Sequence, residues 1–144
     1  METCFAAFST SQLRKLPVDL VKRYLLEVPW CLTDETGCFR ECSDSYLDVY
    51  GYSRQHLIGQ HFTLLLPEEQ RPAAQAMHDR FIAGAAELPG TWEVLDAKGQ
   101  PFRIRINAIH CHAESGTVNK LTILEVVERT GFAAPRLEDF AQRH

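Results

Sequence analysis

The stretch YLDVYGYSRQHLIGQHF, Tyr46 to Phe62, is the most informative part of this 144-residue chain. Its two glycines, Gly51 and Gly59, each follow a short run with helical character. Glycine commonly ends a helix because it adopts a left-handed backbone conformation without a steric cost. Ser43 or Asp44 is a suitable N-cap for the first run. The stretch therefore predicts two short helices in succession, each stopped by a glycine.

Segments typical of strands lie on both sides of these helices. Upstream, residues 30–33 and 38–42 flank the turn DETG and predict a hairpin. Downstream, residues 67–84 predict a longer helix, and residues 90–129 predict three strands joined by the turns DAKGQ and AESGTVNK. Apolar side chains occupy alternate positions from Phe102 to Ala108, which indicates a sheet with one buried face. This order predicts an α+β fold, in which helices pack on one face of a five-stranded antiparallel sheet.

An isomerase-type cone of helices on a curved sheet is the alternative fold. That fold normally begins with long helices, so the early hairpin argues against it. Outside the sheet, residues 1–28 predict an N-terminal helical extension and residues 130–144 a C-terminal linker helix leading toward an output domain. The extension has one apolar stripe, formed by Leu20, Val21, Tyr24, Leu25 and Val28.

Composition excludes several classes of protein. The net charge of −4 gives no sign of the basic face that contact with nucleic acid requires. No run of 18 apolar residues is present, so no membrane-spanning helix is expected. The five cysteines are odd in number and lack a CxxC pair, which favours a reducing cytoplasm over a disulfide framework. No nucleophile elbow, HExxH or P-loop pattern occurs, so we do not expect an enzyme.

Several motifs together resemble the PAS family over about residues 29–129. TDETGCF resembles its first hairpin, YLDVYGYSRQHLIGQHF its central stretch, LLLPEEQ the entry to its long helix, and WEVLDAKGQPFRIRINA its later hairpin. Ser43 departs from the asparagine that the family often carries there, although serine also caps helices. The resemblance implies a sensory or regulatory module that binds a small molecule or dimerises. It also implies a relay to an output domain, as in LuxR-type transcription regulators with a PAS sensor.

The resemblance implies a ligand cavity between the sheet and the long helix. Alternate strand residues share a face, and small-molecule sites are mostly apolar, so the predicted lining is mainly apolar. The predicted cofactor-binding residues are Phe62, Leu66, Met77, His78, Phe81, Trp92, Ile104, Ile106 and Ile123. The apolar stripe of the N-terminal extension needs a covering surface, either the free face of the sheet or the same helix of a second subunit, and a homodimer is expected.

The sequence leaves the identity of the cofactor open. HDRFI, which begins at His78, resembles the haem-ligating pattern of PAS oxygen sensors, and a haem-based gas sensor with His78 as axial ligand is an alternative function. Those relatives carry an arginine on the next strand, where Trp92 and Glu93 stand here. Light-sensing relatives carry a reactive cysteine where Phe62 stands, so a flavin adduct is excluded and only non-covalent flavin remains. A dimerisation module without a ligand is the other alternative.

A metal site is also weighed at one strand. His110, Cys111 and His112 place two imidazoles on one strand face, a spacing that zinc can use. A closed zinc site needs further ligands, and the remaining cysteines supply no obvious pair. No metal is therefore expected.

Overall fold

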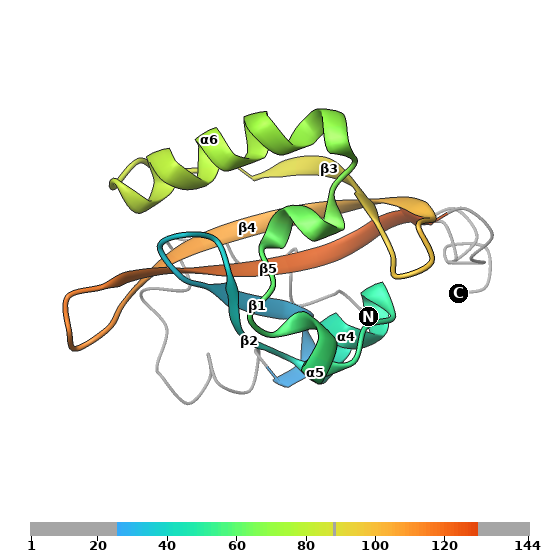
Figure 1. Ribbon diagram of the computed structural model, residues 1–144, viewed down its shortest axis with the longest axis horizontal. Helices are drawn as coiled ribbons and strands as arrows, with labels where there is room; N and C mark the ends of the chain where they lie inside the picture. The colour runs from blue at the N-terminus through green and yellow to red at the C-terminus, as the bar shows by residue number, and fades with distance from the viewer. Residues whose placement is uncertain (1–25, 88, 130–144) are drawn as a thin grey trace, which may run out of the picture.

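The computed structural model describes residues 26–87 and 89–129 (Figure 1). The strands are β1 (Trp30–Thr33), β2 (Phe39–Cys42), β3 (Gly90–Leu95), β4 (Pro101–His112) and β5 (Val118–Arg129). Between β2 and β3 lie the helices α4 (Asp44–Tyr50), α5 (Arg54–Leu57) and α6 (Arg71–Ile82) and the 3-10 turns η1 (Phe62–Leu65) and η2 (Glu68–Gln70). The predicted linker helix and nearly all of the predicted N-terminal extension lie outside the described residues.

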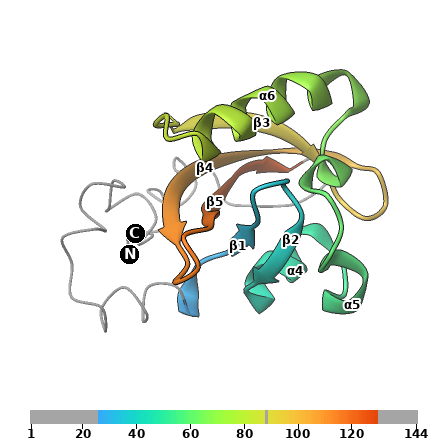
Figure 2. The same ribbon diagram turned by 60° about the vertical axis from the view of Figure 1, so that its left-hand side comes forward.

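The strands form one antiparallel sheet in the order β2-β1-β5-β4-β3. The first and last strands of the sequence therefore pair beside each other within the sheet. In both views, α6 crosses one face of the sheet over β3 and β4 (Figures 1 and 2). The predicted α+β fold, with helices on a five-stranded antiparallel sheet, is confirmed. No helix among residues 26–87 and 89–129 is long and apolar enough to cross a bilayer.

The two short helices begin and end as the sequence predicts. The Ser43 hydroxyl accepts a hydrogen bond from the Tyr46 amide and caps α4, and Gly51 ends that helix with a φ of 81°. Ser43 also accepts from the Trp30 amide at 3.0 Å. One hydroxyl group therefore both caps α4 and connects the start of this helix to β1.

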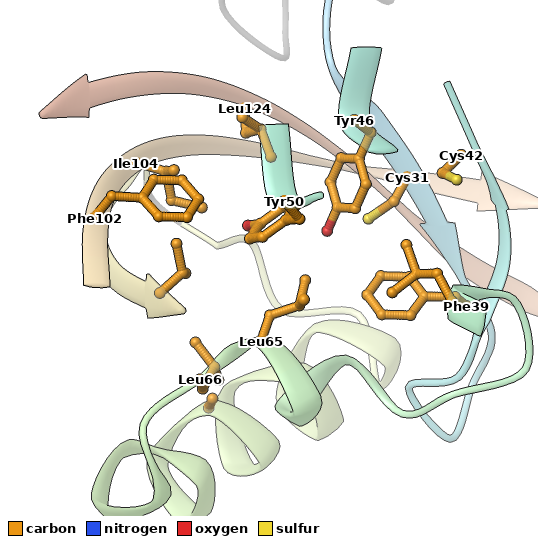
Figure 3. Close-up of a cluster of buried hydrophobic side chains, with 13 residues drawn as sticks. Cys31, Phe39, Cys42, Tyr46, Tyr50, Leu65, Leu66, Phe102, Ile104 and Leu124 are labelled. Carbon is orange, nitrogen blue, oxygen red and sulfur yellow. The ribbon is translucent and has the colours of Figure 1, made fainter. Parts of the chain in front are cut away.

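The core lies between the helices and the inward side chains of the sheet. Tyr46 and Tyr50 of α4 stand next to each other, with ring centroids 4.9 Å apart, and Cys31 of β1 lies beside Tyr46 (Figure 3). Tyr50 also packs on Phe102 of β4, at 5.4 Å. These aromatic contacts fix the first short helix against both halves of the sheet.

In two hairpins, the turn begins with an aspartate and has a glycine three residues later. In the β1–β2 turn, Asp34 Oδ1 accepts hydrogen bonds from the Thr36, Gly37 and Cys38 amides, each at 3.0 Å. In the β3–β4 turn, Asp96 Oδ1 accepts from the Lys98 and Gln100 amides at 2.9 Å. Both glycines have positive φ values, 99° and 79°. The predicted turns DETG and DAKGQ are confirmed, with the aspartate carboxylate as their organising group.

The end of α6 is fastened to β4 by an aromatic stack. The Phe81 and His110 rings lie 3.7 Å apart with an interplanar angle of 1°. His110 Nε2 donates to the Phe81 carbonyl at 2.8 Å. The same carbonyl accepts from the Gly84 amide at 2.9 Å, so the His110 bond is its second and links the end of α6 to the sheet.

Candidate functional site: a cavity under α6

A cavity of about 90 Å³ lies between the inner face of the sheet, α4, η1 and α6. The residues that enclose it come from segments far apart in the sequence, from Cys31 to Thr122. The cavity has two sides of different chemistry, an apolar side and a polar strip.

The apolar side is built mainly by α6, η1, β3 and β4. Met77 of α6, Leu66 after η1, Trp92 of β3, and Ile104 and Ile106 of β4 line it. The two isoleucines share the inward parity of β4, as the alternation of its sequence predicts. This side offers close contacts to a hydrocarbon group.

The polar strip is built by β1 and β5. Cys31 pairs with Thr122 and Thr33 pairs with Lys120 across the two strands, so all four side chains point to the same face. All four line the cavity. Burial raises the pKa of the Cys31 thiol to about 11, so the group is neutral and acts as a weak hydrogen-bonding partner of Tyr46.

A buried ion pair lies at the cavity wall. Lys120 Nζ donates to Glu87 Oε1 at 2.6 Å, and the two side chains are only 11% and 5% exposed. The ammonium also lies 5.0 Å from the centroid of the Phe81 ring, a favourable cation–π position. The cavity therefore has one fixed cation that is matched by one carboxylate.

His78 lies on the cavity side of α6 and is 1% exposed. Its Nε2 is 3.1 Å from the Asp34 carbonyl and 3.2 Å from the Glu35 carbonyl. Since a carbonyl only accepts, Nε2 carries the proton and donates to the turn between β1 and β2. Burial lowers the pKa of His78, and the nearby charge of Lys120 lowers it further. The imidazole is therefore neutral at pH 7 and serves as a clamp between α6 and this turn.

The cavity brings together seven of the nine residues predicted to bind a cofactor. They are Phe62, Leu66, Met77, His78, Trp92, Ile104 and Ile106. Phe81 is buried one turn further along α6, where it stacks on His110. Ile123 is buried but has the opposite parity to Thr122 and Leu124, so it points to the other face of the sheet. Binding of a cofactor by these residues stays a prediction.

Sequence reasoning missed the polar half of the cavity. Lys120 and Glu87 were not predicted, and neither were Thr33, Thr122 or Cys31. The parity of β5 was the signal that could have found Lys120 and Thr122. That signal was ambiguous because β5 carries apolar side chains at both parities, with Leu121 and Ile123 on one and Leu124 and Val126 on the other.

The residues present do not fit a haem bound at His78. The Nε2 atom that would bind iron donates its proton to two carbonyls instead. A volume of about 90 Å³ is also far below the roughly 300–1,000 Å³ of sites that enclose drug-sized ligands, and haem and flavin are at least that large. No group of three or more His, Cys, Asp or Glu side chains in the described part of the chain is arranged to hold a metal ion.

Comparisons with known proteins agree with the observed fold. The family model described as the PAS fold matches residues 24–123. A comparison with curated proteins finds no match.

Among solved structures, the PAS domain of a protein from Colwellia psychrerythraea is 18% identical, with a TM-score of 0.66, covering 77% of this chain and 97% of that one. The PAS domain of the fruit-fly ELK potassium channel is 16% identical, with a TM-score of 0.62, covering 79% and 99%. The PAS-B domain of Drosophila melanogaster Cycle, solved with bound ethylene glycol, is 12% identical, with a TM-score of 0.58, covering 69% and 99%.

Proposed function

Because this chain belongs to the PAS family of general sensory and signalling modules, we propose that it senses a small molecule held in the cavity under α6. The observation that carries the proposal is the composition of the cavity wall, which combines an apolar side with a few placed polar groups. Ligand sites in proteins typically have this composition. The PAS-B domain of Cycle, which has a similar fold and was solved with bound ethylene glycol, supports a ligand of small size.

A cavity-filling variant tests this function. Small fragments, screened by thermal shift and isothermal titration, should bind the wild-type chain. Ile106→Phe adds bulk at an inward position of β4, and Ile109→Phe is the matched control because it adds the same bulk at the opposite parity. We expect fragment binding to be lost in the first variant and kept in the second. Equal binding by both variants would place the ligand outside the cavity, and failure of every fragment to bind would contradict ligand sensing.

The haem alternative has its own measurement. Titration of the wild-type chain with haemin should give no saturable shift of the Soret band, because His78 Nε2 is occupied by the two carbonyls of the turn. A saturable shift that His78→Ala removes would restore the gas-sensor hypothesis.

We further propose that the module works in the cytoplasm as a homodimer and relays its signal to an output domain, for example in transcription regulation. The support for the homodimer comes from the sequence of the N-terminal extension, whose apolar stripe from Leu20 to Val28 needs a covering surface.

Light scattering tests the homodimer. The full chain should have the mass of a dimer, and deletion of residues 1–25 reports whether the N-terminal extension is the dimerisation element. If the full chain has the mass of a monomer at all accessible concentrations, the homodimer and the alternative of a pure dimerisation module are both wrong.

A further inference from the structure

Lys120 and Glu87, which form the buried ion pair of the cavity, are held in different ways. Lys120 lies in β5, where it pairs with Thr33 of β1 on one side and His110 of β4 on the other. Its ammonium is also placed over the Phe81 ring. Glu87 lies between α6 and β3, outside every described helix and strand. The cation is therefore fixed by the sheet, and the carboxylate is the partner that can be exchanged.

Charge balance limits what can take the place of Glu87. Removal of one partner of a buried ion pair leaves an uncompensated charge, which is strongly unfavourable. A neutral ligand that pushed Glu87 aside would leave Lys120 in that state. A ligand that brings its own carboxylate replaces one ion pair by another, and Glu87 regains full hydration.

We propose that the cavity takes a short-chain monocarboxylate, whose carboxylate replaces that of Glu87 on Lys120. Its aliphatic chain lies against Met77, Trp92 and Ile106 on the apolar side of the cavity. This inference rests on the proposed function of the cavity as a ligand site. It adds the chemical class of the ligand and the group that the ligand displaces.

The size of the cavity limits the length of the ligand. At about 90 Å³ it is smaller than the roughly 150 Å³ cavity that accepts benzene in another protein. Carboxylates of about three to five carbons are therefore the best match. An amine that pairs with Glu87 is disfavoured, because it would have to displace Lys120, the partner fixed by two neighbouring strands.

Replacement of the Glu87 carboxylate by that of the ligand also explains how binding can change the structure outside the cavity. Glu87 belongs to the segment that joins α6 to β3. Once a ligand has taken its place, this segment loses its ionic tie to β5. A ligand that binds the two arrangements with different affinity shifts the population between them.

The test uses butanoate and its neutral isostere butanamide, titrated calorimetrically into the full chain. Wild type should bind butanoate about tenfold or more tightly than butanamide, since a hydrogen bond to a charged group is stronger than a neutral one. Glu87→Gln removes the internal competitor and should tighten butanoate binding several-fold without tightening butanamide binding. Lys120→Met should abolish the preference for butanoate.

The double variant Lys120→Met/Glu87→Gln keeps the test valid if Lys120→Met alone fails to fold, because no charge is then left buried without a partner. It should bind butanamide more tightly than butanoate, because the butanoate carboxylate would then be buried without a cation. If wild type binds butanoate and butanamide equally, or binds other fragments but not butanoate, the carboxylate inference is overturned while ligand sensing stands. If neither these compounds nor any fragment binds, ligand sensing itself fails.

Discussion

The turns at residues 34–37 and 96–99 have the same Asp-x-x-Gly pattern, and in both the aspartate carboxylate accepts from backbone amides of the turn, but their surroundings differ. A Cβ atom added at Gly37 would lie 2.7 Å from His61 Nε2 and 2.9 Å from the Phe62 ring, whereas one at Gly99 would meet nothing within 4 Å. The carbonyls of the first turn accept the His78 proton from α6. The second turn is joined to the end of β5 by Arg129, which contacts Asp96 Oδ2 at 3.2 Å.

This difference separates what local sequence determines from what packing adds. The aspartate and the glycine produce the turn in both places because their hydrogen bonds and backbone angles are local. Both turns contact residues of the cavity wall. The first turn accepts hydrogen bonds from the His78 side chain and the Phe62 amide, whereas the second meets Tyr50 through one backbone bond from the Ala97 amide. We expect a change at Gly37 to affect the ligand site more than the same change at Gly99, because only an added Cβ atom at Gly37 would press on a wall residue, Phe62.

The largest expected effect comes from alanine at each glycine. Gly37→Ala should lower the free energy of unfolding by about 3 kcal/mol, because a left-handed alanine is strained and the methyl group also overpacks against His61 and Phe62. Gly99→Ala should cost only about 1 kcal/mol, from backbone strain alone. Urea unfolding measures both. Equal losses would show that the surroundings of the first turn do not matter.

A smaller effect is expected when the clamp on the first turn is removed. His78→Leu leaves the Glu35 carbonyl without its donor and the Asp34 carbonyl with the Gly37 amide alone, and should cost about 1–3 kcal/mol. His78→Gln is the matched control because its amide nitrogen can reach the same carbonyls and should retain most of the stability. Amide exchange at Gly37 should speed up in the leucine variant, while exchange at Gly99 should stay as in wild type. Faster exchange at both glycines would mean that the two turns are coupled.

The smallest effect concerns pH. Burial and the charge of Lys120 lower the pKa of His78 below its ordinary value of 6.5, so the unfolded chain binds this proton more readily than the folded one. The contribution of His78 to stability is therefore complete above about pH 6.5 and is lost as the pH falls through its lowered folded value.

The carboxylates of the two turns titrate in a lower pH range than His78. Burial opposes ionisation of Asp34 and Asp96, but their hydrogen bonds outweigh it, and the pKa of each stays below the ordinary 3.8.

The contribution of His78 can therefore be measured apart from that of the two aspartates. Between about pH 6.5 and 4.5, stability should fall less in His78→Gln than in wild type, as urea unfolding across that range would measure. Parallel pH profiles for the two proteins would contradict the lowered pKa of His78.

Local signals made most of the fold predictable. The caps at Ser43 and Gly51, the two aspartate turns and the alternation from Phe102 to Ala108 all act over a few residues, and each is found where the sequence placed it. The orientation of Ile123 was not predictable, because apolar residues stand on both faces of β5. One face packs on the core, and the other is also covered at Ile123, so alternation carries no information there.

The chemistry of the site depended on contacts between distant residues. Lys120 and Glu87 are separated by 33 positions, and neither has a sequence neighbour that marks it as buried. The pattern HDRFI made haem an alternative because it reports residue types only. Which atom of His78 is already engaged depends on a turn more than 40 residues earlier in the chain, and no local pattern records that contact.

The stack of Phe81 on His110 gives the molecule an internal spectroscopic reporter. A proton held over the face of an aromatic ring at van der Waals distance is shielded by the ring current, so the imidazole carbon-bound protons of His110 should resonate upfield of those of an unstacked histidine. The shielding falls steeply as the rings separate. The chemical shift of one histidine therefore measures how closely the end of α6 lies on the sheet, and it does so without a label at the cavity.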